Sequence, residues 1–175
     1  HLHQYPIRTT RQAAAEYDGP MYIRLTGGPN CPIVYTDNYE FEIGRAIELK
    51  VGSEVAVIAN GSMVAPSIAA ADLLTQHGVS VGVFNFHTVK PLDEQMLTSI
   101  SKAYGLIVTV EEHSIIGGLG SAVAEFVSAL DKPNRVVRLG HPDYFGKTGE
   151  YEFLLQRYGL TADGIVDSVL TEINK

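Results

Sequence analysis

The sequence predicts an α/β fold in which a mostly parallel sheet of about five strands lies between two layers of helices. From about residue 51 onward, short hydrophobic stretches rich in Val and Ile alternate with helical segments. This alternation is typical of βαβ units with right-handed crossovers. The apolar stretches are unbroken, which indicates strands that are covered on both faces. Fold class therefore follows from the pattern, whereas function requires a site.

The elements of this domain follow one another in a regular order. Residues 41–49 are expected to form a short strand and a turn. Strands are predicted at residues 54–58, 79–86, 106–110 and 134–139, and helices at residues 62–77, 91–104, 117–130, 151–158 and 161–173. Gly78 and Gly105 mark the ends of two helices, because glycine accepts the left-handed backbone that often terminates a helix. Pro91 stands at a helix start, where its missing N–H is not needed.

The first 28 residues do not follow this pattern. Residues 9–17 are Ala-rich and begin with a Thr that can cap a helix, and residues 21–25 are predicted to form one short strand. A lone helix and strand cannot build a core, so residues 1–28 are interpreted as the tail of a preceding domain. Residues 29–39 lie in a stretch rich in Gly, Pro and Asn and are interpreted as a linker. Residues 40–175 then form the second domain.

Composition excludes several classes of protein. The net charge is −7 and the basic residues are scattered, so no basic surface is available for nucleic acid. Cys31 is the only cysteine, which rules out an internal disulfide and a structural zinc site and suits a reducing compartment. No signal peptide is visible, and no apolar run approaches the roughly 20 residues that span a bilayer. A cytoplasmic protein without a membrane partner is therefore expected, and the missing initiator Met suggests a processed product or a fragment.

Residues 108–125 are the most informative segment. A strand runs into two carboxylates and a histidine, a glycine-rich turn follows, and a helix then begins with small residues. Ligands bind at the carboxyl ends of strands in open parallel sheets, so this turn is a candidate channel or interface. The competing interpretation is a tight structural turn, in which Gly118 is expected to need a positive φ. The candidate residues are Glu111, Glu112, His113, Gly117, Gly118 and Gly120.

Three further groups of residues are weaker candidates for a ligand-binding or catalytic site. His87, Lys90 and Asp93 follow the second predicted strand, which suits ligand contact but also an ordinary helix start. His141 lies two residues before an aspartate, as in an acid–base pair or a simple turn. Arg24 ends a short apolar strand, where a guanidinium can bind phosphate or carboxylate in a bidentate manner. The sequence has no phosphate-binding loop, no nucleophile turn and no cluster of metal ligands.

Five stretches of the chain, in this order, resemble the end of transketolases. They are residues 19–25 (GPMYIRL), 54–64 (EVAVIANGSMV), 88–93 (TVKPLD), 108–125 (VTVEEHSIIGGLGSAVAE) and 141–165 (HPDYFGKTGEYEFLLQRYGLTADGI). The likeness extends over nearly the whole chain. It is shared with deoxyxylulose phosphate synthases and with the β-subunits of 2-oxoacid dehydrogenases. The last stretch is most similar to transketolases, especially those encoded as two polypeptides.

The resemblance implies the C-terminal portion of a thiamine-diphosphate-dependent enzyme of the pentose phosphate pathway. The parent enzyme would move a two-carbon ketol unit between sugar phosphates, with the cofactor as electron sink. Residues 1–28 would end the pyrimidine-binding domain, and residues 40–175 would be the C-terminal domain. Thiamine diphosphate and magnesium would be bound by the remaining domains or by an N-terminal subunit. This chain would carry no catalytic residue, bind no cofactor or metal, stabilise a homodimer and rim the substrate channel.

Among the candidate residues, the resemblance gives a ligand to Arg24 alone. Relatives place an arginine there that grips the phosphate of the sugar substrate. His87 departs from the synthase relatives, which tend to have Arg in the corresponding segment. Two other functions are considered: a partner-docking domain like that of a 2-oxoacid dehydrogenase β-subunit, and a free-standing small-molecule binding domain that uses the turn at residues 111–120.

Overall fold

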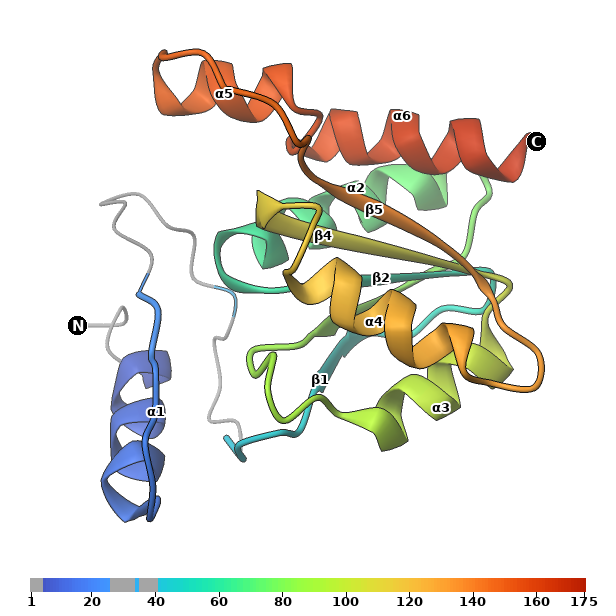
Figure 1. Cartoon of the computed structure of the whole chain (residues 1–175). Coiled ribbons are helices and arrows are strands. Elements are labelled where there is room, and N and C mark those ends of the chain that lie inside the picture. Colours follow the sequence, from blue (N-terminus) through green and yellow to red (C-terminus); the bar gives the residue numbers. More distant parts are fainter. Residues whose placement is uncertain (1–4, 26–33, 35–40) are drawn as a thin grey trace.

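The computed structural model describes residues 5–25, 34 and 41–175 (Figure 1). Apart from Val34, the predicted linker at residues 29–39 lies outside the described residues, and so does Cys31. The helices are α1 (Tyr5–Glu16), α2 (Val64–Gln76), α3 (Glu94–Ala103), α4 (Leu119–Ser128), α5 (Tyr151–Arg157) and α6 (Ala162–Ile173), with a short 3-10 helix η2 (Gly61–Met63) before α2. The strands are β1 (Ile47–Lys50), β2 (Val55–Ala59), β3 (Val81–Asn85), β4 (Leu106–Ser114) and β5 (Arg135–His141).

The strands form one sheet of five in the order β1-β3-β2-β4-β5. β1 runs antiparallel to β3, and all other neighbours are parallel. In the centre, Val55 of β2 lies opposite Val81 of β3 and Leu106 of β4. The predicted α/β class, with a mostly parallel sheet of about five strands, is confirmed.

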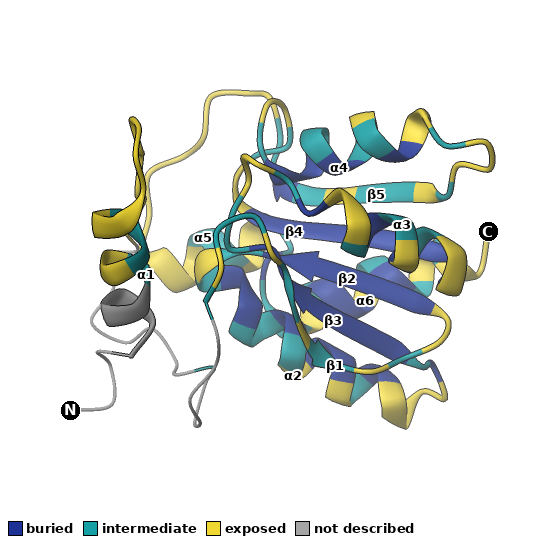
Figure 2. Ribbon diagram, turned by 90° about the horizontal axis from the view of Figure 1, so that it is seen from below, coloured by how far each residue is buried: buried dark blue, intermediate teal, exposed yellow. Residues whose placement is uncertain are grey.

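Helices cover both faces of the sheet, with α2 and α6 on one side and α3 and α4 on the other (Figure 1). Successive residues of a strand point to opposite faces, and β2 feeds both cores in this way. Val57 packs with Leu74 of α2 and Ile165 of α6, whereas Ile58 packs with the apolar residues of α3 and α4. Figure 2 shows the central strands buried, as expected for a sheet enclosed by two helical layers.

Two predictions about strands are wrong. Residues 21–25 form no strand and are exposed, because no described segment offers them a hydrogen-bonding neighbour. The predicted strand at 106–110 continues to Ser114, because β4 remains paired with β5 beyond a register irregularity and Ser114 lies opposite His141. The carboxylates of the informative segment therefore lie inside a strand rather than after it. Within the described residues, no helix is long and apolar enough to cross a membrane.

Candidate functional site

The carboxyl ends of β2 and β4 form the topological switch point of the sheet. The chain passes from β2 to β3 on one side and places β4 on the other side, which is the arrangement where open α/β sheets usually bind ligands. Ser62 follows β2 here, and Glu111, Glu112 and His113 end β4. The structure therefore brings part of the predicted candidate set to the expected edge.

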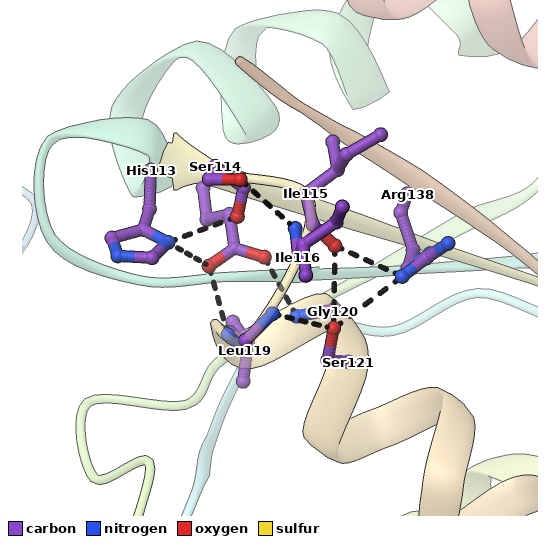
Figure 3. Close-up of polar contacts among 10 residues, drawn as sticks. His113, Ser114, Ile115, Ile116, Leu119, Gly120, Ser121 and Arg138 are labelled. Carbon is purple, nitrogen blue, oxygen red and sulfur yellow. Dashed lines mark hydrogen bonds and ion pairs between the residues drawn. The ribbon is translucent and has the colours of Figure 1, made fainter. Parts of the chain in front are cut away.

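Glu111 occupies the anion position at the start of α4. Its carboxylate is buried and accepts hydrogen bonds from the backbone N–H groups of Leu119, at 2.8 Å, and Gly120, at 2.7 Å (Figure 3). The N-cap residue Gly118 has no side chain to do this, so Glu111 replaces a conventional cap from the neighbouring strand. A helix N-terminus attracts anions, and here the chain's own carboxylate satisfies it.

The glycines of the turn have two different roles. Gly117 adopts the positive φ, at 80°, whereas Gly118 has a φ of −100°, so the expectation of a positive φ at Gly118 is wrong. A Cβ at Gly118 would lie 2.8 Å from Cδ of Glu111, and a Cβ at Gly120 would lie 3.1 Å from Oε1 of the same carboxylate. Gly118 thus leaves room for the Glu111 carboxylate. Gly120 leaves room first for the Thr109 hydroxyl, 2.6 Å from an added Cβ, and then for the same carboxylate. Gly117 turns the backbone.

Side chains that sequence reasoning missed hold the same turn. The Ser121 hydroxyl accepts a hydrogen bond from the Gly117 N–H at 2.9 Å and lies 3.3 Å from the Ile115 carbonyl oxygen. Arg138 of β5 donates to that carbonyl at 2.9 Å (Figure 3). Nothing local in the sequence marks Arg138, because it acts from the neighbouring strand. The turn is therefore closed by hydrogen bonds from β5 as well as from its own helix.

Glu112 and His113 lie on the surface beside this buried arrangement. The Glu112 carboxylate accepts hydrogen bonds from the Ser62 hydroxyl and, at 2.9 Å, from the Tyr151 hydroxyl. It therefore ties α5 to the switch point. His113 keeps its Nδ1 2.9 Å from the Ser114 carbonyl oxygen and 3.9 Å from the Glu111 carboxylate. Both side chains are exposed to solvent.

His87 lies apart from the turn at residues 111–120 and packs against the beginning of the domain. Its ring stacks on Phe41 with centroids 4.4 Å apart, and its Nδ1 lies 3.0 Å from the Thr88 hydroxyl. Burial lowers the pKa of His87 from 6.5, and a backbone hydrogen bond to Arg45 opposes this shift. Asp93 caps α3 through the Met96 N–H at 2.9 Å. The helix-start interpretation of this region therefore fits the structure.

The remaining sequence candidates do not join this site. The His141 ring lies 4.4 Å from the Tyr158 ring, measured between centroids, and no ion pair connects it to Asp143 among the described residues. Arg24 lies in the exposed segment that follows α1. Within the ranges that the structure describes, no group of three or more His, Cys, Asp and Glu side chains is placed to hold a metal ion.

Comparison with known proteins adds a family match. A family model described as the transketolase C-terminal domain matches residues 44–165. A protein of Methanocaldococcus jannaschii, described as a putative transketolase C-terminal section, is 36% identical over 173 residues, which cover 98% of this chain and 54% of the relative. A 6-deoxy-6-sulfo-D-fructose transketolase subunit of Clostridium sp. (strain MSTE9) is 42% identical over 150 residues, or 86% of this chain and 46% of that subunit.

A synthase and a solved structure are also similar to this chain. A 1-deoxy-D-xylulose-5-phosphate synthase of Caldanaerobacter subterraneus is 39% identical over 153 residues, which cover 87% of this chain and 25% of the synthase. A solved structure described as an inactive β4 tetramer of a split-gene transketolase superimposes with a TM-score of 0.88 at 41% identity, covering 94% of this chain and 53% of that one. The chain thus spans about half the length of the Methanocaldococcus relative and of the split-gene transketolase chain.

Proposed function

The chain belongs to the transketolase C-terminal domain family, and we propose that it acts as the C-terminal part of a transketolase. The complete enzyme transfers a two-carbon ketol unit between sugars, with thiamine diphosphate as the electron sink. Support comes from the relative described as a transketolase C-terminal section and from the split-gene transketolase structure, which both match nearly the whole chain. In this proposal, residues 40–175 are the C-terminal domain, and the cofactor-binding parts lie in other domains or in an N-terminal subunit.

The proposed role of this domain rests on one observation: the anion position at the switch point of the sheet is already occupied. The anion position at α4 is taken by Glu111, so a bound diphosphate there would meet a buried carboxylate. Glu112 is likewise engaged by Ser62 and Tyr151. These residues do not fit thiamine diphosphate, and none of them is free to activate it. In this proposal the domain contributes surfaces that stabilise the assembled enzyme and rim the substrate channel, rather than catalytic groups.

Residues 1–28 contribute to the pyrimidine-binding domain in this proposal. Large apolar side chains are exposed in this stretch, namely Tyr17, Met21, Tyr22, Ile23 and Leu25. Such a run is unfavourable in water, because burying one large apolar side chain is worth roughly 1.5–3 kcal/mol. A neighbouring strand of the complete enzyme would pair with residues 21–25 and cover them. Localisation in the cytoplasm is part of the same proposal.

Arg24 is the residue of this chain that we assign to substrate. A planar guanidinium at the end of the exposed segment can bind a tetrahedral oxyanion through two parallel hydrogen bonds. Phosphate is the first choice for that oxyanion. The Clostridium relative is named for a sulfonated sugar, so sulfonate is the second. Competition between 6-phosphorylated and 6-sulfonated fructose in the complete enzyme distinguishes the two.

We further propose that the chain associates with copies of itself and with a cofactor-binding partner. The split-gene relative is described as an inactive tetramer of one subunit type, which supports both self-association and inactivity of the isolated subunit. Calorimetry with thiamine diphosphate and magnesium is expected to detect no binding by this chain alone. Ketol transfer from xylulose 5-phosphate to ribose 5-phosphate is expected only after an N-terminal transketolase subunit is added. Micromolar cofactor binding by the isolated chain would refute the assignment.

A deoxyxylulose phosphate synthase parent is the second candidate, because a synthase is 39% identical over most of this chain. The synthase reaction joins pyruvate to glyceraldehyde 3-phosphate with loss of carbon dioxide, whereas ketol transfer releases none. Carbon dioxide release by the reconstituted enzyme on these two substrates therefore separates the candidates. A 2-oxoacid dehydrogenase docking domain predicts instead that the chain is captured by a lipoyl-bearing acyltransferase.

A further inference from the structure

Residues 41–46 lead into the edge strand β1, and they are called the junction turn. Figure 2 shows β1 at the edge of the sheet, beside β3. The predicted linker ends at residue 39, so the junction turn lies where the second domain begins. It contacts residues 86–93, the connection from β3 to α3. How firmly these two segments hold each other therefore decides how the domain is attached to the chain that precedes it.

Backbone contacts hold the junction turn against that connection. The Ala46 N–H donates to the Asp93 carboxylate at 2.8 Å, and the same buried carboxylate caps α3 through the Met96 N–H. Gly44 adopts a φ of 82°, and an added Cβ there would lie 3.0 Å from Cγ of Pro91. Glycine suits both this backbone and the close approach. The turn is thus shaped to fit the connection, and one carboxylate fastens both segments.

His87 lies in this contact, and its position suits a neutral ring. The ring stacks on Phe41 with centroids 4.4 Å apart, and Nδ1 lies 3.0 Å from the Thr88 hydroxyl. Nε2 is buried and has no partner within normal hydrogen-bond geometry among the described residues. Burial outweighs a backbone hydrogen bond to Arg45 and lowers the pKa of His87 from 6.5. Protonation would place a charge and an additional N–H donor where the fold offers little to receive them.

The charged groups of the two segments do not compensate a protonated His87. Glu42 and Arg45 of the junction turn pair with each other, with Nε and Oε1 3.6 Å apart. In the connection, Lys90 is exposed, and the Asp93 carboxylate already holds two backbone N–H groups. None of the ion pairs among the described residues includes His87. A charged ring would therefore be stabilised better by water than by this contact.

We propose that the junction turn is a pH-sensitive hinge, docked on residues 86–93 while His87 is neutral and released when His87 is protonated. Release frees the start of the second domain and so loosens its attachment to residues 1–28. That consequence rests on the proposed function, in which residues 1–28 belong to another domain, whereas the release itself does not. Histidine is the side chain whose charge ordinarily changes between about pH 5 and 8.

The direction of the pH effect follows from proton uptake. Release returns the ring to water and to its ordinary pKa, so below about pH 6.5 the released form binds a proton that the docked form does not. Docking is therefore fully favoured above about pH 6.5 and weakens as the pH falls through the lowered pKa of His87. Because one proton is taken up, the equilibrium constant for release changes by at most about tenfold per pH unit.

Amide hydrogen exchange of the full chain, followed by NMR between about pH 5 and 8, tests the hinge. The Ala46 N–H is bonded to Asp93 only when the turn is docked, so its protection factor reports docking. The N–H of Val57, which is buried in the central strand β2, reports global unfolding. Ala46 is expected to be less protected than Val57 throughout, and its protection should fall with pH below about 6.5. Equal protection of the two amides at every pH would overturn the hinge.

Two histidine variants and one titration identify the sensor. His87→Phe keeps a neutral aromatic ring beside Phe41 and should make the protection of Ala46 independent of pH. His77→Phe is the matched control, because His77 is exposed after α2, and it should leave the pH dependence as it is. In the unmodified chain, the ring signals of His87 should titrate with a midpoint below about 6.5. A higher midpoint, or a pH dependence that persists in His87→Phe, would overturn the role of His87.

The regulatory consequence is tested in the complete enzyme, reconstituted with an N-terminal transketolase subunit. Ketol transfer should decline on acidification over the pH range in which Ala46 loses protection, and it should decline less steeply with His87→Phe. Identical pH profiles of the two enzymes would overturn the regulatory role. Absence of ketol transfer at every pH, with the hinge still seen by hydrogen exchange, would instead overturn the proposed function and leave the hinge standing.

Discussion

Replacing Gly118 with alanine tests whether the turn at the switch point exists to accommodate Glu111. The backbone at Gly118 is extended, with a φ of −100°, so alanine suits the conformation and any cost must come from contact. The new methyl would lie 2.8 Å from Cδ of Glu111, whereas carbon atoms normally stay about 3.5–4.0 Å apart. The carboxylate must therefore move away from its two backbone partners.

The magnitude follows from those two hydrogen bonds. A hydrogen bond to a charged group contributes about 1.5–3 kcal/mol, and displacement weakens one or both bonds to Leu119 and Gly120. Gly118→Ala is therefore expected to lower the free energy of unfolding by roughly 2–5 kcal/mol. Gly117→Ala is the matched control. It forces alanine to a φ of 80° with no atom within 4 Å of the added methyl, a strain of about 1–2 kcal/mol.

A double-mutant cycle in chemical denaturation separates contact from backbone strain. In a Glu111→Ala background the carboxylate is gone, and the exposed His113 ring, whose Nδ1 lies 2.9 Å from the added methyl, can turn away. Gly118→Ala should then lower the free energy of unfolding by less than about 1 kcal/mol. The coupling energy between the two positions should be about 2 kcal/mol or more. If Gly118→Ala lowers the free energy of unfolding equally in both backgrounds, the glycine is required by the backbone conformation and not by contact with Glu111. The account of Glu111 as the reason for the glycine would then be wrong.

Three other predictions concern residues around this site. Burial lowers the pKa of His87 from 6.5, so the folded state favours the neutral ring. The contribution of this preference to folding stability is therefore present above about pH 6.5 and is lost as the pH falls through the lowered pKa. Urea titrations across this pH range should show that His87→Phe makes the free energy of unfolding less dependent on pH. An unchanged slope of unfolding free energy against pH would contradict this prediction. Tyr151→Phe should lower the free energy of unfolding by less than about 1 kcal/mol, since the hydrogen bond from Tyr151 to Glu112 is exposed. A larger loss of stability in thermal melting would mean that α5 depends on this hydrogen bond. In the complete enzyme, Arg24→Ala should lower kcat/KM for phosphorylated donors by about 10- to 150-fold, with Lys restoring part of the loss; equal loss on hydroxypyruvate would show that Arg24 only supports its segment.

The parts of the fold that were predictable are those in which local pattern and tertiary environment agree. The four parallel strands and the five helices α2–α6 appear where the hydrophobic pattern places them, although α3 begins at Glu94 after its Asp93 cap and not at Pro91. Residues 21–25 have a strand-like sequence, but a strand exists only with a neighbour. The extension of β4 to Ser114 likewise depends on β5, which lies further along the chain. No local sequence signal reports such pairing.

In the candidate site, the sequence indicates which residues lie there but not what each of them does. Glu111 was selected as a group at the carboxyl end of a strand, and the structure places it there, but as the cap of α4. That role depends on the distance from strand to helix, which spacing along the chain does not give. In the sequence, Ser121 is only one of several small residues at a helix start and Arg138 carries no signal, although both hold the turn. Their shorter hydrogen bonds join them to main-chain groups, which carry no sequence signature.

The two consecutive carboxylates before the glycines acquire a physical explanation from this geometry. A pyrophosphate at the N-terminus of α4 would have to displace Glu111, which is buried and already holds two N–H groups. Removing those bonds without replacement would leave a buried charge unpaired, at a cost of several kcal/mol. An acidic residue at the end of a strand, followed by glycines at a helix start, therefore indicates a switch point that the chain caps by itself. In this chain, the first N–H groups of α4 are therefore open to an anionic ligand only if Glu111 moves away.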